Sequence, residues 1–134
     1  MARPPKHGLD YFSFYTNMYD DEKIYDLTDQ YGPLGEAVYL RLLCMIYDKG
    51  YYIKCKDINS MASIISRSIG SQWGKRNKIA DIIRFLPACE LLDQCCMAEN
   101  VLTSKRIQES WYSAMTVMKR KIPDDKEYWL LENQ

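Results

Sequence analysis

A cluster of basic side chains is the part of this chain best suited to a chemical task. Residues 67–84 carry five basic residues against one acid, Asp81. The basic members are Arg67, Lys75, Arg76, Lys78 and Arg84. Lysine and arginine neutralise backbone phosphates, and both arginine and Asn77 have hydrogen-bonding groups that read base edges. The cluster predicts contact with nucleic acid, and the alternative is ordinary solvated charge at the start of a helix.

The overall charge limits what such contact can achieve. The 134 residues include 18 basic and 18 acidic side chains, so the formal net charge is zero. Residues 1–50 have five basic and eight acidic residues, a net charge of −3, whereas residues 67–84 have a net charge of +4. A protein without net positive charge is not a general polyanion binder. We therefore expect modest, salt-sensitive and weakly sequence-specific DNA binding.

Residue types that support catalysis or metal binding are scarce. His7 is the only histidine, and the five cysteines form no C-x-x-C pair. We interpret the adjacent Cys95 and Cys96 as small buried residues, with metal binding or oxidation as the less favoured alternative. The chain has no Ser/His/Asp or Cys/His arrangement and no phosphate-binding G-x-x-x-x-G-K-[ST] loop. We expect no enzyme, no cofactor and no metal site.

Trp73 lies between Gly70 and Gly74, just ahead of the basic helix. A tryptophan in such a turn either anchors the turn in the core or stacks on a base. We favour the core anchor.

The spacing of apolar residues predicts the elements that position this cluster. We expect helices over 20–31, 34–49, 58–69, 79–86 and 105–118, and short strands over 51–54, 91–92 and 101–102. Gly32-Pro33 separates the first two helices. In the fourth helix, Ile79, Ile82, Ile83 and Leu86 form the apolar stripe. The opposite, outward face is then made of Asn77, Ala80, Asp81 and Arg84.

This order of elements is typical of a winged helix. We expect a fold that is mainly α with a small β-wing, a winged helix-turn-helix, over residues 1–122 with an extended N-terminal arm. Residues 123–134 include the apolar run 128–131, which we expect to dock on the domain or on a neighbour. No apolar run approaches the roughly 20 residues that span a bilayer, and the start lacks a secretory signal. We expect a cytoplasmic protein without membrane contact.

Several motifs resemble the N-terminal domain of phage and prophage proteins related to the DnaD replication initiators. They are Gly8-Leu9-Asp10-Tyr11-Phe12, Asp21-Glu22-Lys23-Ile24, Val38-Tyr39 with Leu42-Leu43, Gly50-Tyr51-Tyr52-Ile53, and 102–108, "LTSKRIQ". The resemblance implies a winged-helix domain of a replication-initiation or primosome-associated protein, with DNA contact and self-association as roles and no catalytic residues. The chain departs from that family in the long basic segment "RSIGSQWGKRNK" and in Glu90, which stands where a glycine commonly precedes the wing. Family members also tend to carry a separate C-terminal domain.

The leading hypothesis is a non-enzymatic DNA-binding module of a phage-type replication initiator or primosome component. The expected contact residues are Arg67, Lys75, Arg76, Asn77, Lys78 and Arg84, extended by Lys105 and Arg106 beside the wing and by Arg3 and Lys6 in the arm. The expected partners are DNA and other replication proteins, and a further copy of the chain is a candidate partner in a homo-oligomer. The alternative is an oligomerisation or scaffolding module of the primosome, in which the helix-turn-helix is architectural.

Overall fold

Helix α1 (Glu22–Lys49) runs through the middle of the molecule and is sharply kinked. The computed structural model describes residues 7–131, and the arm residues Arg3 and Lys6 lie outside this range. At the kink, Gly32 has φ 62° and ψ −151°, a conformation open to glycine and strained for other residues. Pro33 follows directly and has no backbone N–H to donate. The predicted break at Gly32-Pro33 is therefore confirmed, as a kink inside one element.

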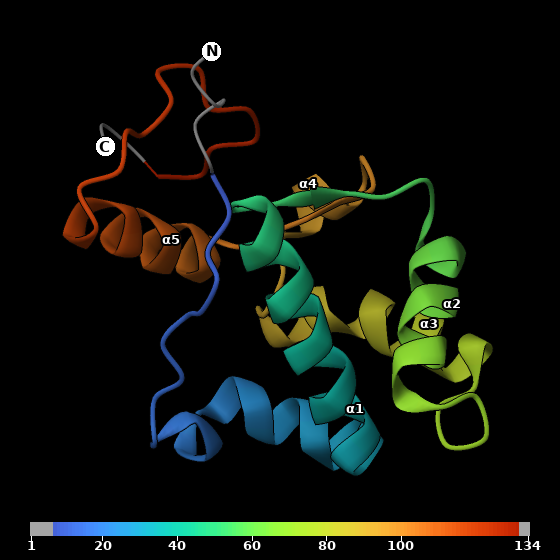
Figure 1. The fold of residues 1–134 in the computed structure, drawn as a ribbon. Coiled ribbons are helices and arrows are strands. Elements are labelled where there is room, and N and C mark those ends of the chain that lie inside the picture. Colours follow the sequence, from blue (N-terminus) through green and yellow to red (C-terminus); the bar gives the residue numbers. More distant parts are fainter. Residues whose placement is uncertain (1–6, 132–134) are drawn as a thin grey trace.

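The second half of α1 supplies the centre of the hydrophobic core. Its buried side chains recur at helical spacing; they are Val38, Tyr39, Leu42, Leu43, Ile46 and Tyr47. Helices α2 (Ile58–Ile69) and α3 (Arg76–Phe85) pack against each other and against α1. Figure 1 shows these two helices to the right of α1. Helix α2 buries Ile58, Met61, Ala62 and Ile65, which recur at helical spacing, and α3 buries Ile79, Ile82 and Ile83 of its predicted stripe. The two helices thus pack together on one side of α1.

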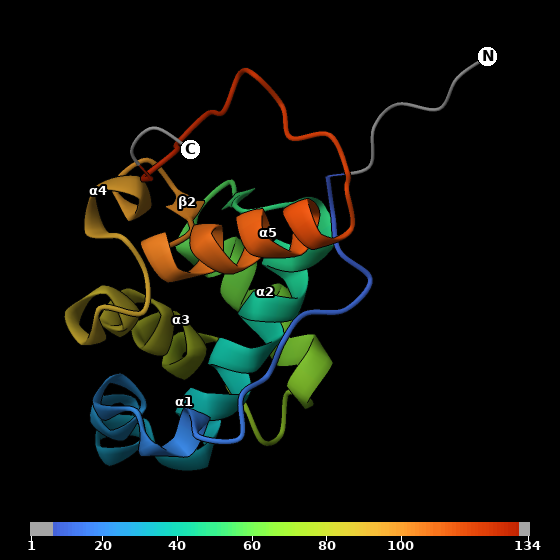
Figure 2. The ribbon, with the colours of Figure 1, turned by 90° about the vertical axis from the view of Figure 1, so that its left-hand side faces the viewer.

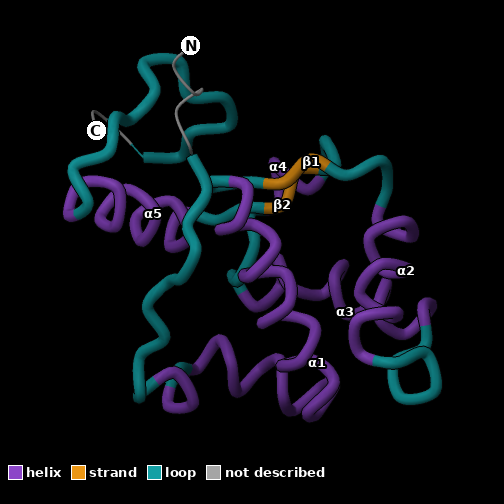
Figure 3. Tube along the Cα trace, in the orientation of Figure 1, coloured by secondary structure: helices purple, strands orange, loops and turns teal. Residues whose placement is uncertain are grey.

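A two-stranded antiparallel sheet includes the segment that connects α1 with α2. Strand β1 (Ile53–Lys54) pairs with β2 (Val101–Leu102), with Ile53 opposite Leu102 and Lys54 opposite Val101. Figure 3 shows the two strands as the orange segments beside each other above α1. Thr103, which follows β2, donates its hydroxyl to the backbone carbonyl of Tyr51. The prediction of a mainly α fold with a small sheet is confirmed.

The predicted strand at Leu91-Leu92 is wrong. A short 3-10 helix η2 (Leu86–Cys89) and helix α4 (Gln94–Met97) occupy this part of the chain. Leu91 and Leu92 are both buried, at 2% and 3% exposure, so they do not alternate as a half-exposed strand would. Asp93 instead caps α4 by accepting a hydrogen bond from the backbone N–H of Cys96 at 2.9 Å. Over residues 7–131 the sheet therefore has two strands and lacks the first strand of a wing.

Glu90 closes η2 in a left-handed conformation, with φ 61° and ψ 24°. L-residues other than asparagine and aspartate rarely adopt this conformation, and glycine adopts it without a steric cost. The backbone N–H of Glu90 donates to the carbonyl of Pro87 at 3.0 Å, as expected for a turn that ends a helix.

Both ends of the described chain lie against α5 (Lys105–Val117), as Figures 1 and 2 show. At one end, Trp111 of α5 is fully buried and donates its indole N–H to the carbonyl of His7 at 2.7 Å. At the other end, the Gln108 side chain donates to the carbonyl of Tyr128 at 2.9 Å and accepts from the backbone N–H of Leu130 at 2.7 Å. The segment before α1, which includes the 3-10 helix η1 (Met18–Asp20), runs alongside α1 and α5. None of the helices over 7–131 is long and apolar enough to cross a membrane.

Candidate nucleic-acid interface

The turn between α2 and α3, residues 70–75, is fixed by hydrogen bonds and by close packing. The backbone N–H groups of Trp73 and Gly74 both donate to the carbonyl of Gly70 at 2.9 Å. The buried hydroxyl of Ser66 in α2 donates to the carbonyl of Gly74 at 2.6 Å. A Cβ on Gly74 would lie 3.1 Å from side-chain atoms of Ile69 and of Ile79, so only glycine fits here without movement. The turn therefore has one defined shape.

Trp73 projects from this turn into solvent with 77% of its surface exposed. The prediction that it anchors the turn in the core is wrong. The inner position is taken by Gly74, whose backbone sits directly on Ile69 and Ile79 and leaves no room for an indole. The edge of the indole instead lies over Gly70, where a Cβ would be 3.5 Å from Trp73 Cδ1. An exposed tryptophan in a fixed turn has a free π-face on which a base can stack.

The start of α3 places three basic side chains beside Trp73. Lys75 is the N-cap residue, and its side chain makes no capping hydrogen bond. Lys75, Arg76, Asn77 and Lys78 are all exposed. The Nζ of Lys78 lies 5.0 Å from the centroid of the Tyr31 ring, a cation–π contact with α1. The uncapped N–H groups and the positive charge of the helix dipole at this end favour an anionic group such as a phosphate.

The outward face of α3 is smaller than predicted. Ala80 was expected on this face, but it is buried at 1% exposure. The reason is that α3 packs against both α1 and α2, which requires an apolar surface wider than one stripe. Asn77, Asp81 and Arg84 are exposed, as expected, and the Arg84 guanidinium donates to the side-chain carbonyl of Asn59 in α2 at 3.3 Å. Arg67, in the last turn of α2, is also exposed.

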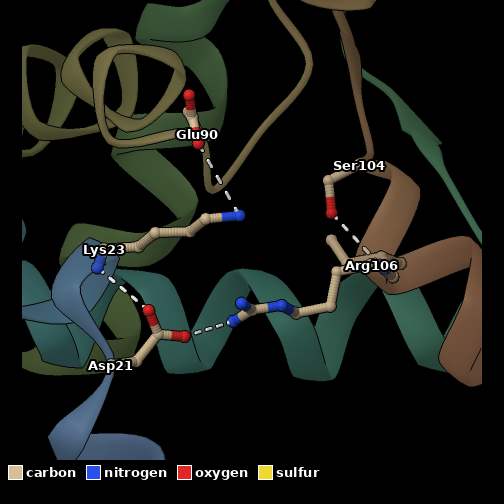
Figure 4. A network of polar contacts seen from close by, with 6 residues as sticks. Asp21, Lys23, Glu90, Ser104 and Arg106 are labelled. Atoms are coloured by element: carbon tan, nitrogen blue, oxygen red, sulfur yellow. Dashed lines mark hydrogen bonds and ion pairs between the residues drawn. The ribbon is translucent and has the colours of Figure 1, made fainter.

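Arg106 is separated from this cluster and has a partner of its own. Its guanidinium Nη1 lies 2.6 Å from Oδ2 of Asp21, the N-cap residue of α1, as Figure 4 shows. Asp21 also accepts from the backbone N–H of Lys23 at 2.9 Å. Burial raises the pKa of Asp21, but the hydrogen bonds from Lys23 and Arg106 outweigh it and hold the pKa below its ordinary value. The Lys23 ammonium is in turn 3.9 Å from Glu90, so the four side chains link α1, α5 and the end of η2.

Lys105 is exposed at the first position of α5, next to Arg106. Figures 1 and 2 both show the start of α5 well apart from the turn between α2 and α3. The structure thus brings together Trp73, Lys75, Arg76, Asn77 and Lys78, and it does not bring Lys105 and Arg106 to them. We call the first group, with residues 70–78 as its bounds, the basic turn.

The exposure of Trp73 was not predicted, although the two glycines that flank the turn, Gly70 and Gly74, were an available signal. The prediction that Cys95 is buried is wrong, because Cys95 is exposed, whereas Cys96 is buried as expected. Among the described residues, no group of three or more histidine, cysteine or acidic side chains is placed to hold a metal ion.

Comparisons with known proteins identify the family. The family model described as Lin1244/Lin1753-like, N-terminal, matches residues 11–107. The chain is 30% identical over 135 residues to the uncharacterized phage-related protein Lin1244/Lin1753 of Listeria innocua. This similarity covers 98% of the chain and 42% of the relative, so the chain spans less than half the length of that protein. No solved structure matches the chain. The chain therefore belongs to the phage-related Lin1244/Lin1753-like family and contains its N-terminal domain.

Proposed function

We propose that this domain is a non-enzymatic DNA-binding module that contacts the DNA backbone through the basic turn. The observation that carries the proposal is the exposed Trp73, held in a fixed turn beside Lys75, Arg76 and Lys78. Positive charge next to an aromatic ring is the combination that binds phosphates and stacks on bases. The relative is described as phage-related, and this description together with the resemblance to DnaD-type proteins supports a role in replication initiation or in a primosome.

In this proposal α2 and α3 act as a helix-turn-helix within a reduced winged helix. The sheet of this reduced winged helix consists of β1 and β2 alone, and α4 stands in the region where the first strand of a wing is expected. The start of α3 approaches the phosphates, as the N-terminal end of a recognition helix does. Lys105 and Arg106 are not part of this contact surface, because they lie apart from the turn and Arg106 is paired with Asp21.

The proposed binding is weakly specific. Four cations, Arg67, Lys75, Arg76 and Lys78, are available for phosphates, which predicts that log K falls with log salt at a slope of roughly −3 to −4. On the outward face of α3, Asp81 is exposed between Asn77 and Arg84 and repels phosphates. Arg84 is also held toward Asn59, so few side chains remain for base readout.

The test is a salt series of binding to single-stranded, duplex and forked DNA. We expect low-salt binding that Lys75→Glu/Arg76→Glu/Lys78→Glu weakens by about tenfold or more, since each change removes one phosphate contact. The matched control is Lys49→Glu/Lys56→Glu/Lys121→Glu, which makes the same change of net charge at exposed lysines outside the basic turn. Two results would contradict the proposal: no binding by the unaltered protein at low salt, or equal losses in the two triple variants. Tight binding to one operator with strong base discrimination would instead indicate a repressor.

A further inference from the structure

A cleft of about 810 Å³ opens between the segment before α1, α1 itself and α5. This volume lies in the range of roughly 300–1,000 Å³ found for ligand-binding pockets. Its apolar lining includes Phe12, Phe14, Leu43, Tyr47, Val117 and Met118. Phe12 stacks on Tyr47 with ring centroids 4.7 Å apart, and Phe14 is 46% exposed at the cleft. The cleft therefore has aromatic walls, and one bulky apolar side chain can enter it.

The charged residues that line the cleft are mainly acidic. They are Asp20, Asp21 and Glu109, with Arg106 as the one basic residue among the described lining residues. Arg106 is neutralised by its ion pair with Asp21. Asp20 and Glu109 are exposed, so the lining as a whole carries a net negative charge. An occupant that fits combines an aromatic group with nearby positive charge.

The basic turn of the same chain has this combination. Trp73 is 77% exposed, and Lys75, Arg76 and Lys78 follow it within five residues on the solvent side. Figure 1 shows the turn between α2 and α3 on one side of the molecule and the segment before α1, with α5, on the opposite side. Figure 2 views the molecule from the side of that segment and α5. One copy cannot place its own turn in its own cleft, but a second copy can.

We propose that the domain self-associates head to tail, with Trp73 of one copy seated in the acidic aromatic cleft of the next. Lys75 and Arg76 then face the acidic residues of the cleft, including Glu109. Since the two surfaces differ, each bound copy leaves one free turn and one free cleft, so the association is open-ended. A buried tryptophan removes roughly 150–250 Å² from water, which makes this a small, weak and salt-sensitive interface. The same turn serves the proposed DNA contact, so DNA and a neighbouring copy compete for it.

The experiment compares two single variants, each of which removes one of the two surfaces. Trp73→Ala removes the side chain that enters the cleft. Ser113→Arg places a long basic side chain at an exposed α5 position that lines the cleft. Thr116→Arg is the matched control, because Thr116 is also exposed on α5 and is not among the residues that line the cleft. Mass is measured by sedimentation velocity and light scattering over a concentration series at low salt, after circular dichroism shows unchanged folding.

We expect the mass of the unaltered protein and of Thr116→Arg to rise with concentration beyond that of a dimer. Trp73→Ala and Ser113→Arg each weaken association by roughly 30-fold or more, as loss of a central contact does. A mixture of the two variants regains association and stops at a 1:1 dimer, because one variant keeps the cleft and the other keeps Trp73. A two-fold symmetric interface would instead stop the unaltered protein at a dimer.

The inference is overturned if the unaltered protein stays monomeric at every concentration, if association survives Trp73→Ala, or if the mixture stays monomeric. These outcomes do not bear on DNA binding. Ser113→Arg leaves the basic turn intact, so we expect it to keep DNA affinity while it loses association, which separates a failure of this inference from a failure of the DNA contact.

Discussion

Replacing Ser66 with alanine tests whether the shape of the basic turn depends on one buried hydrogen bond. Ser66 is 7% exposed, and its hydroxyl donates to the carbonyl of Gly74 at 2.6 Å. Ser66→Ala removes the donor and leaves the buried carbonyl of Gly74 without this partner. The change otherwise deletes only one atom from a well-packed helix.

The magnitude follows from the cost of a buried polar group that loses its hydrogen bond, about 1–3 kcal/mol. For a domain of this size, that loss lowers Tm by roughly 3–10 °C. A second effect is local to the turn. Gly74 is also the point at which the turn packs on Ile69 and Ile79, so its release increases the motion of the adjacent Trp73. We expect a lower fluorescence anisotropy from Trp73 and a weaker DNA affinity.

Ser63→Ala is the matched control on the same helix. The Ser63 hydroxyl donates to the carbonyl of Asn59 at 3.2 Å, but this pair is exposed and water replaces it. Urea unfolding of the two variants measures the difference, for which we expect less than about 0.5 kcal/mol in Ser63→Ala. If Ser66→Ala is as stable as Ser63→Ala and leaves the Trp73 signal unchanged, then the turn does not depend on this hydrogen bond and our account of its rigidity is incorrect.

Two further predictions concern pH and cysteine reactivity. The pKa of Asp21 is below its ordinary value of 3.8, so its ion pair with Arg106 stabilises the fold fully above the unfolded pKa and is lost as pH falls through the folded pKa. The gap in unfolding free energy between the unaltered protein and Asp21→Asn is therefore constant near neutral pH and narrows as pH falls below about 4; a gap that widens as the pH falls through this range contradicts this assignment. Burial raises the pKa of Cys96 to about 12 and that of Cys89 to about 11, while Cys95 and Cys44 are exposed. Alkylation of the native protein followed by mass spectrometry should modify Cys44 and Cys95 first, and equal labelling of Cys95 and Cys96 would be inconsistent with the structure.

The helices were predictable because their apolar residues repeat at helical spacing. The stripes in α2 and α3 and the break at Gly32-Pro33 depend only on residues near one another in the chain. The strand predicted at Leu91-Leu92 failed because two adjacent leucines fit any buried segment, and the cap formed by Asp93 favours a short helix. Ala80 was misplaced because the second packing partner of α3 leaves no local signal.

The candidate site shows the same division. The basic residues of the turn are adjacent in sequence, so local reasoning placed them together correctly. The ion pair of Arg106 could not be predicted in this way, because its partner Asp21 lies 85 residues away in the chain. The exposure of Trp73 depends on how Gly74 packs, since only the absence of a side chain at Gly74 allows the turn to approach α2 and α3 closely.

The contacts of α5 have a consequence for how the chain folds. The bond from Trp111 to His7 spans 104 residues of sequence, and the bond from Arg120 to the carbonyl of Gly8 spans 112. Closing loops of this length costs entropy that is recovered only when the packing is complete. We expect α1, α2 and α3 to form an early nucleus and α5 to join late. During synthesis, the large aromatic surface around Trp111 then stays exposed until nearly the whole domain has left the ribosome, which makes this step the one most prone to aggregation.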